Sequence, residues 1–174
     1  MPVFLHIGCG PNRKGPATPG FDTPEWEELR VDISPAGKPD ILADMTDLSA
    51  IAAESVDAVF SSHNLEHIDA HLVPKALGEF RRVLKPDGYV VVTCPDLQLV
   101  ASLVAQGHLT QPIYNSTAGP ISPLDIIYGH QAAIAAGKTY MAHRCGFTLK
   151  SLFDALIDAR FAMASAARRR ANLE

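Results

Sequence analysis

Apolar, β-branched runs alternate with stretches of helical periodicity over the first hundred positions of the chain. Four of these runs predict buried strands, at 3–7, 29–33, 58–60 and 89–94. Between the last two runs, apolar residues recur at helical spacing over 72–84, and residues 85–88 (Lys-Pro-Asp-Gly) predict the turn that ends this helix. A strand, a helix and a second strand of these lengths form a parallel crossover unit, so the pattern predicts an α/β fold.

The second half of the chain has helical periodicity and one long connector. Asp96, Ser122 and Thr148 are of residue types that cap helices, and each precedes apolar positions at helical spacing. We expect the first two helices to end near residues 106 and 136. Residues 107–123 are rich in Gly, Pro, Ser and Thr and predict an irregular connector. The last apolar stretch predicts a closing strand over about 161–168.

Length and charge limit the classes of function. The 174 residues fit one domain, and 15 Lys and Arg against 19 Asp and Glu give a net charge of −4. A nucleic-acid-binding domain normally concentrates a basic excess on one face, whereas the local basic run here is confined to 168–170. We therefore expect no nucleic-acid partner.

The cysteines and the first residues of the chain bear on its location. Cys9, Cys94 and Cys145 lie far apart and form no CxxC pair, which predicts neither a disulfide framework nor a thiolate zinc site and favours a reducing compartment. The N-terminal residues lack the basic start of a signal peptide, and no run approaches the ~18 apolar residues of a membrane span. We expect a cytoplasmic protein with no membrane contact.

A glycine turn follows the first predicted strand. Gly8 and Gly10 are separated by one residue, a spacing that permits a tight turn and close backbone approach to a ligand, but that is also found in ordinary turns. A nicotinamide-binding fingerprint needs a small residue at position 13, where the chain has Arg13. Asp32 ends the second predicted strand at about the distance where a carboxylate accepts hydrogen bonds from both ribose hydroxyls.

Five sequence blocks resemble, in order and spacing, the class I S-adenosylmethionine-dependent methyltransferases, specifically the small-molecule group called type 11. The blocks lie at 5–10, 31–34, 43–45, 57–67 and 80–88. The resemblance implies a Rossmann-like, doubly wound, mostly parallel sheet. It also implies that residues 1–174 form a single methyltransferase-like domain, in which 107–147 is an insertion or lid on the side of the methyl acceptor.

The resemblance further implies a cofactor site at the carboxyl ends of the strands. In it the backbone of the glycine turn lies against the methionine and ribose, one aspartate holds the ribose hydroxyls, and a second accepts from the adenine amino group. Two apolar side chains sandwich the adenine ring, and two serines line the sulfonium end. In chain order these residues are Gly8, Cys9, Gly10, Asp32, Ile33, Asp44, Met45, Ser61 and Ser62. Core packing is the alternative for Ile33 and Met45.

Three further residues are candidates for the reaction itself. His63 follows the fourth-strand block and is the first candidate for a catalytic base. Tyr128 and His143 lie in the segment where such enzymes place their acceptor pocket, so we expect them to contact the substrate.

The chain departs from the family pattern in three places. Residues 11–24 contain four prolines, so the helix expected after the glycine turn is missing or reduced to a turn. Residues 34–39 are too few for a crossover helix of ~10 residues. The chain also stops at Glu174, where the family has another edge strand. We therefore expect abbreviated early helices and an incomplete C-terminal strand pair.

The sequence as a whole predicts an enzyme that transfers the methyl group of S-adenosylmethionine to an O, N or S atom of a small molecule, leaving S-adenosylhomocysteine. A noncatalytic cofactor-binding or partner protein of the same fold is an alternative. Another is a zinc hydrolase, because residues 63–67 match H-x-x-E-H, in which two histidines one helical turn apart bind the metal. That motif needs a third ligand, for which Glu79 and His71 are only nominal candidates, so we expect no metal.

Overall fold

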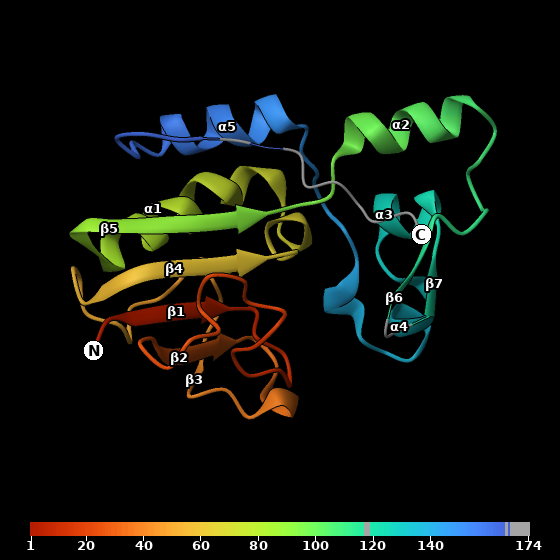
Figure 1. Cartoon of the computed structure of the whole chain (residues 1–174). Coiled ribbons are helices and arrows are strands. Elements are labelled where there is room, and N and C mark those ends of the chain that lie inside the picture. The colour runs from red at the N-terminus through yellow and green to blue at the C-terminus, as the bar shows by residue number, and fades with distance from the viewer. Residues whose placement is uncertain (117–118, 166, 168–174) are drawn as a thin grey trace. The chain divides into compact units, whose positions relative to one another are not determined.

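Five parallel strands form the sheet of the computed structural model, which describes residues 1–116, 119–165 and 167 (Figure 1). The strands lie in the order β3-β2-β1-β4-β5, as the predicted Rossmann-like fold requires. Their bounds are Val3–Ile7 for β1, Glu27–Asp32 for β2, Ile41–Leu42 for β3, Val56–Ser62 for β4 and Leu84–Thr93 for β5. The chain order reverses between β1 and β4, and a sheet of this kind binds its ligand beside that reversal, at the carboxyl ends of the strands.

One helix, α1 (Val73–Val83), makes the crossover from β4 to β5, and Figure 1 shows it behind these strands. Its apolar residues recur at the predicted helical spacing, and Ala76, Leu77 and Phe80 are completely buried. The helix ends at Val83, just before 85–88, as predicted. These four residues lie within the bounds of β5 and not in a separate turn, but the pairing with β4 passes from Leu84 directly to Tyr89. A register shift in β4 between Val56 and Ala58 accommodates the longer strand.

The chain divides into two compact units. The first comprises Met1–Asn64 and Leu72–Thr93 and contains the sheet, and the second comprises Leu65–His71 and Cys94–Glu174. The segment 107–147, expected on the acceptor side, therefore falls within the second unit.

Aromatic side chains take the place of the missing early helix in the first unit. As expected from its prolines, the segment 8–26, all of it described, contains turns and no helix. Phe21 from this segment is 2% exposed and stacks on Phe4 of β1, with ring centroids 4.5 Å apart. Trp26 and Phe60 contact Phe21 edge-on. This cluster covers apolar surface that a crossover helix otherwise buries.

The buried side chain of Arg30 on β2 holds together the loops at the carboxyl edge of the sheet. It is 2% exposed, and its guanidinium group donates four hydrogen bonds to backbone carbonyls. The acceptors and the N···O distances are Gly10 (2.6 Å), Lys38 (2.8 Å), Gly37 (2.9 Å) and Asn12 (3.1 Å). The 3₁₀ turn Pro35–Gly37, which replaces the second crossover helix, is thereby fixed against the glycine turn.

Helices dominate the second unit, as predicted, but one of them is broken. The helix α2 (Leu97–Ala105) is capped by Asp96, and α5 (Leu149–Asp158) by Thr148. The single helix predicted from Ser122 to 136 is instead α3 (Pro123–Tyr128) and α4 (Gln131–Ala135). They are separated at Gly129, which has a φ of 92° and is so close to the chain that a Cβ there would lie 2.1 Å from the Met141 carbonyl oxygen.

Two further predictions for the second unit need correction. The connector 107–123 contains an antiparallel hairpin of β6 (Tyr114–Ser116) and β7 (Gly119–Ile121). The closing strand over 161–168 is not formed at 161–165 or at 167, and its other positions lie outside the described residues. In the described part of the chain, no helix has the length and apolarity needed to cross a membrane.

Candidate functional site

The two glycines after β1 have different roles, although both adopt the left-handed conformation. Their φ angles are 62° for Gly8 and 54° for Gly10. A Cβ on Gly8 would lie 1.9 Å from the Oδ1 atom of Asn64, whose amide donates to the Ile7 carbonyl. Gly8 therefore makes room for the side chain of Asn64, and the contact of its backbone with a cofactor stays a prediction. A Cβ on Gly10 meets no atom within 4 Å, so this part of the turn is open to a ligand.

Asp32 lies beside that open position at the end of β2. Its Oδ2 atom accepts a hydrogen bond from the Gly10 amide and its Oδ1 atom accepts one from the Ser34 amide, both at 2.7 Å. A carboxylate has about four acceptor positions, so two remain after these contacts. The same side chain thus fixes the turn and retains the capacity to bind a vicinal diol. The open space at Gly10 and this acceptor capacity fit the ribose of a nucleoside cofactor.

The residues after β2 and β3 are those predicted to contact the adenine ring of the cofactor. The side chain of Ile33 is 57% exposed, which excludes the core-packing alternative for this residue. Met45 is half-buried. Asp44 is exposed, and its Oδ1 atom accepts from the Thr46 amide at 2.8 Å.

The residues after β4 differ in their access to a ligand. Ser61 is completely buried, and its hydroxyl accepts a hydrogen bond from the Asn64 amide, so its side chain is occupied by a contact within the protein. The Ser62 hydroxyl is paired with that of Thr93 at 2.8 Å. Next to it, His63 is exposed, has a φ of 57°, and donates its backbone amide to the Thr93 carbonyl.

The backbone conformation at His63 also argues against the zinc-hydrolase alternative. His63 is in the left-handed region, and a 3₁₀ turn, Leu65–His67, begins two positions later. His63 and His67 therefore do not share one face of an α-helix, which the H-x-x-E-H site requires. Among the described residues, the group of ligand-type side chains that comes together is Glu66, His67 and His143.

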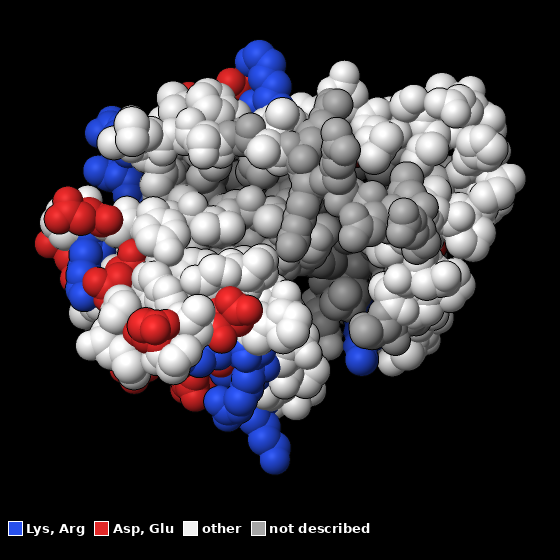
Figure 2. Space-filling model, viewed as in Figure 1, with Lys and Arg blue, Asp and Glu red and all other residues white. Residues whose placement is uncertain are grey.

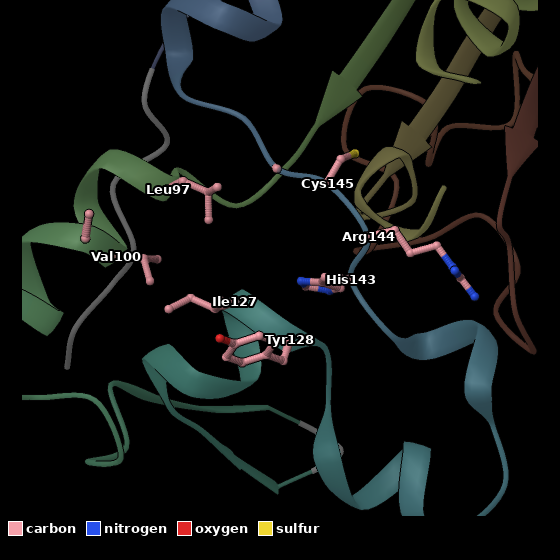
Figure 3. A pocket seen from close by; sticks show the side chains of 9 residues that line it. Leu97, Val100, Ile127, Tyr128, His143, Arg144 and Cys145 are labelled. Atoms are coloured by element: carbon pink, nitrogen blue, oxygen red, sulfur yellow. The ribbon is translucent and has the colours of Figure 1, made fainter. Parts of the chain in front are cut away.

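A cavity of about 480 Å³ lies within the second unit (Figure 3). Its lining includes the apolar side chains of Leu97, Val100 and Ile127, together with Tyr128 and His143. Both residues that the sequence assigned to the acceptor side thus lie at one cavity. Figure 3 shows the His143 ring pointing into it.

The cysteines of the second unit are poor nucleophiles. Burial raises the pKa of Cys145 to about 11, and the Glu66 carboxylate adds to the shift. Burial and the same carboxylate also raise the pKa of Cys94 strongly. Because the thiolate is the reactive form, covalent catalysis by either thiol is disfavoured near neutral pH.

The sheet and its switch-point site define a class of protein, the doubly wound α/β proteins that bind a nucleoside cofactor at the carboxyl ends of their strands. A sequence model described as methyltransferase domain matches residues 5–92, about half of the chain. The chain therefore belongs to this family, the class I S-adenosylmethionine-dependent methyltransferases. Among curated proteins, no sequence matches the chain.

Solved structures with the same fold include three bacterial and archaeal methyltransferases. One is an S-adenosylmethionine-dependent methyltransferase from Archaeoglobus fulgidus, with 19% identity, a TM-score of 0.57, and coverage of 92% of this chain and 61% of that one. An enzyme from Thermotoga maritima, described as a possible histamine N-methyltransferase, has 17% identity, a TM-score of 0.56, and coverage of 94% and 65%. The geranyl diphosphate C-methyltransferase of Streptomyces coelicolor has 14% identity, a TM-score of 0.52, and coverage of 92% and 54%. The chain thus spans about 60% of the length of the first structures it matches.

Proposed function

We propose that the chain transfers the methyl group of S-adenosylmethionine to an O, N or S atom of a small molecule. The observation that carries this proposal is the arrangement of Asp32 beside the open face of Gly10, at the switch point of a sheet that belongs to a methyltransferase family. The bound cofactor supplies an electrophilic methyl group on a sulfonium. The protein then has to bind the cofactor, align the nucleophile behind the methyl carbon and exclude water.

Different residues of the first unit bind different parts of the cofactor. Asp32 binds the ribose hydroxyls, and the Gly10 backbone lies against the ribose and methionine. The exposed side chain of Ile33, with Met45, packs on the adenine ring, and Asp44 accepts from its amino group. The backbone after β4, at Ser62 and His63, lines the sulfonium end.

We assign the role of catalytic base to His63, an exposed imidazole at the end of β4. A general base contributes most when the acceptor is a hydroxyl or a protonated amine, because a proton must then leave the nucleophile. Replacing His63 by alanine is expected to lower turnover by ~10²-fold while the affinity for S-adenosylhomocysteine changes much less. Steady-state kinetics and a binding titration on the same preparation measure the two effects.

His108→Ala is the matched control, because His108 is also exposed but lies in the second unit beyond α2. Its turnover should equal that of the unmodified chain. Full turnover in His63→Ala would leave methyl transfer in place and remove His63 as its base.

The cavity of the second unit is the proposed acceptor pocket. Its volume of about 480 Å³ is within the usual ~300–1,000 Å³ of small-molecule sites. Its lining combines apolar side chains with the polar residues Tyr128, His143 and Arg144, which suits an amphipathic small molecule. On the face shown in Figure 2, Lys and Arg side chains lie among Asp and Glu side chains.

Formation of S-adenosylhomocysteine in the presence of small oxygen, nitrogen and sulfur nucleophiles tests the proposal. We expect turnover with at least one of these acceptor classes. The competing account is a noncatalytic cofactor-binding protein, and it predicts cofactor binding with no turnover above the acceptor-free rate across the panel.

A further inference from the structure

Two segments far apart in the sequence lie side by side in the second unit and bring three ligand-type side chains together. The ligand atoms of Glu66, His67 and His143 all lie within 4.8 Å of one another. We propose that these three residues form a binding site for a divalent transition-metal ion, with zinc as the ion that suits them. None of the three residues is among those proposed to bind the cofactor, and the proposal does not depend on methyl transfer.

The backbone holds the two segments together independently of any ion. The amides of Arg144 and Cys145 both donate to the Glu66 carbonyl, at 2.7 and 3.3 Å. The Cys145 thiol donates to the Leu65 carbonyl at 3.2 Å. The 3₁₀ turn that carries Glu66 and His67 is therefore tied directly to the segment that carries His143, so the three side chains are positioned before an ion binds.

The hydrogen bonds of the two histidines select the tautomer that a metal needs. The Nδ1 atom of His67 lies 3.2 Å from the Ala142 carbonyl oxygen, and the Nδ1 atom of His143 lies 2.6 Å from that of Ile126. A carbonyl only accepts, so each Nδ1 carries the proton and donates it. The lone pair of each ring is then on Nε2. An imidazole that donates from one nitrogen to a carbonyl and ligates through the other is the usual arrangement at metal sites.

The third group supplies the negative charge. Glu66 is only 2% exposed, and it lies on the same short turn as His67. A buried carboxylate beside two imidazoles suits a divalent ion, because the charge of the ion offsets part of the cost of burying the carboxylate. Two histidines and one glutamate are a ligand set that zinc uses in sites with an open fourth position.

The ligand atoms of the three side chains have to move only slightly closer to one another to bind a zinc ion. Ligand atoms about 2.0–2.1 Å from a tetrahedral zinc ion lie roughly 3.3 Å from one another. The ligand atoms now lie within 4.8 Å of one another, so each separation has to shorten by at most about 1.5 Å to reach that spacing. Because the His143 ring points into the cavity of Figure 3, the open coordination position is available to water or to an oxygen atom of a molecule in that cavity.

Zinc titration of the chelator-treated full chain, followed by calorimetry, tests the site. We expect about one ion per chain. His67→Ala and His143→Ala should each weaken zinc binding by at least ~100-fold, since even the loss of an outer hydrogen-bond partner costs ~10- to 100-fold. His71→Ala is the matched control, an exposed histidine on the neighbouring 3₁₀ turn, and should bind zinc as the unmodified chain does.

Two further measurements distinguish the loss of a metal ligand from the loss of the folded structure. His143→Gln removes the imidazole but retains a side-chain amide that donates to a carbonyl, so it separates loss of a ligand from loss of the fold. An unchanged far-UV circular dichroism spectrum and an unchanged unfolding transition report that the whole chain, including the second unit, is folded. Cobalt(II) should give visible absorption bands with the unmodified chain that are lost in His143→Gln. Absence of stoichiometric zinc binding, unchanged binding in both histidine variants, or loss of binding in Cys145→Ser with retention in His143→Gln would each overturn the proposal.

Discussion

Replacing Asp32 by alanine is expected to weaken the binding of S-adenosylhomocysteine by about ten- to 150-fold. The loss of hydrogen bonds to a charged group costs roughly 1.5–3 kcal/mol, and this range of free energy corresponds to that range of affinity. The carboxylate also accepts from the Gly10 and Ser34 amides, so its removal loosens the turn that the cofactor contacts. Calorimetric titration of the folded variant measures the change.

The control for this variant is Asp22→Ala, which removes an exposed carboxylate from the same unit. It should bind S-adenosylhomocysteine as tightly as the unmodified chain. An Asp32→Ala variant that folds and retains its full affinity would show that this carboxylate does not hold the ribose.

Replacing Arg30 by methionine is expected to lower the free energy of unfolding by at least about 3 kcal/mol. Methionine fills much of the same volume but removes the buried donor of four carbonyl groups, and the loss of a buried hydrogen bond costs ~1–3 kcal/mol before the structure relaxes. Arg30→Lys should recover only part of the loss, because one ammonium group cannot reproduce the planar fork of the guanidinium. Urea unfolding measures both variants.

Arg13→Met provides the comparison, because Arg13 is exposed in the same loop region. Its free energy of unfolding should change by less than about 0.5 kcal/mol. A loss of similar size for Arg30→Met would mean that the four carbonyl contacts do not stabilise the loops at the carboxyl edge.

The sheet could be predicted from the sequence because its strands are short apolar runs whose pattern is local. The errors come from positions where a distant contact decides the outcome. Residues 85–88 have the composition of a turn, and they lie within the bounds of β5 as an irregularity, because the pairing with β4 passes from Leu84 directly to Tyr89. Gly129 breaks a helix because the chain at Met141 passes too close for a side chain, and no local pattern reveals that approach.

The candidate site shows the same limit. The spacing of Gly8, Gly10 and Asp32 locates the turn, but only the position of Asn64 shows that Gly8 serves protein packing. In the sequence, Arg30 is a polar residue in a predicted strand. Its four carbonyl partners belong to two loops, so the sequence pattern does not reveal them. His143 and the turn at Glu66 are likewise far apart in the sequence. Backbone hydrogen bonds bring the two segments together, and no local sequence pattern predicts these bonds.

The most direct test of the account is a thermal-shift and calorimetric titration of the chain with S-adenosylhomocysteine, with NAD as the comparison ligand. The account predicts one bound S-adenosylhomocysteine per chain and a rise in melting temperature, which corresponds to about 2.7 kcal/mol of added stability at ~100 times the dissociation constant. It predicts no shift with NAD, because Arg13 replaces the small residue that the dinucleotide turn requires. A well-folded sample that binds neither S-adenosylmethionine nor S-adenosylhomocysteine would contradict it.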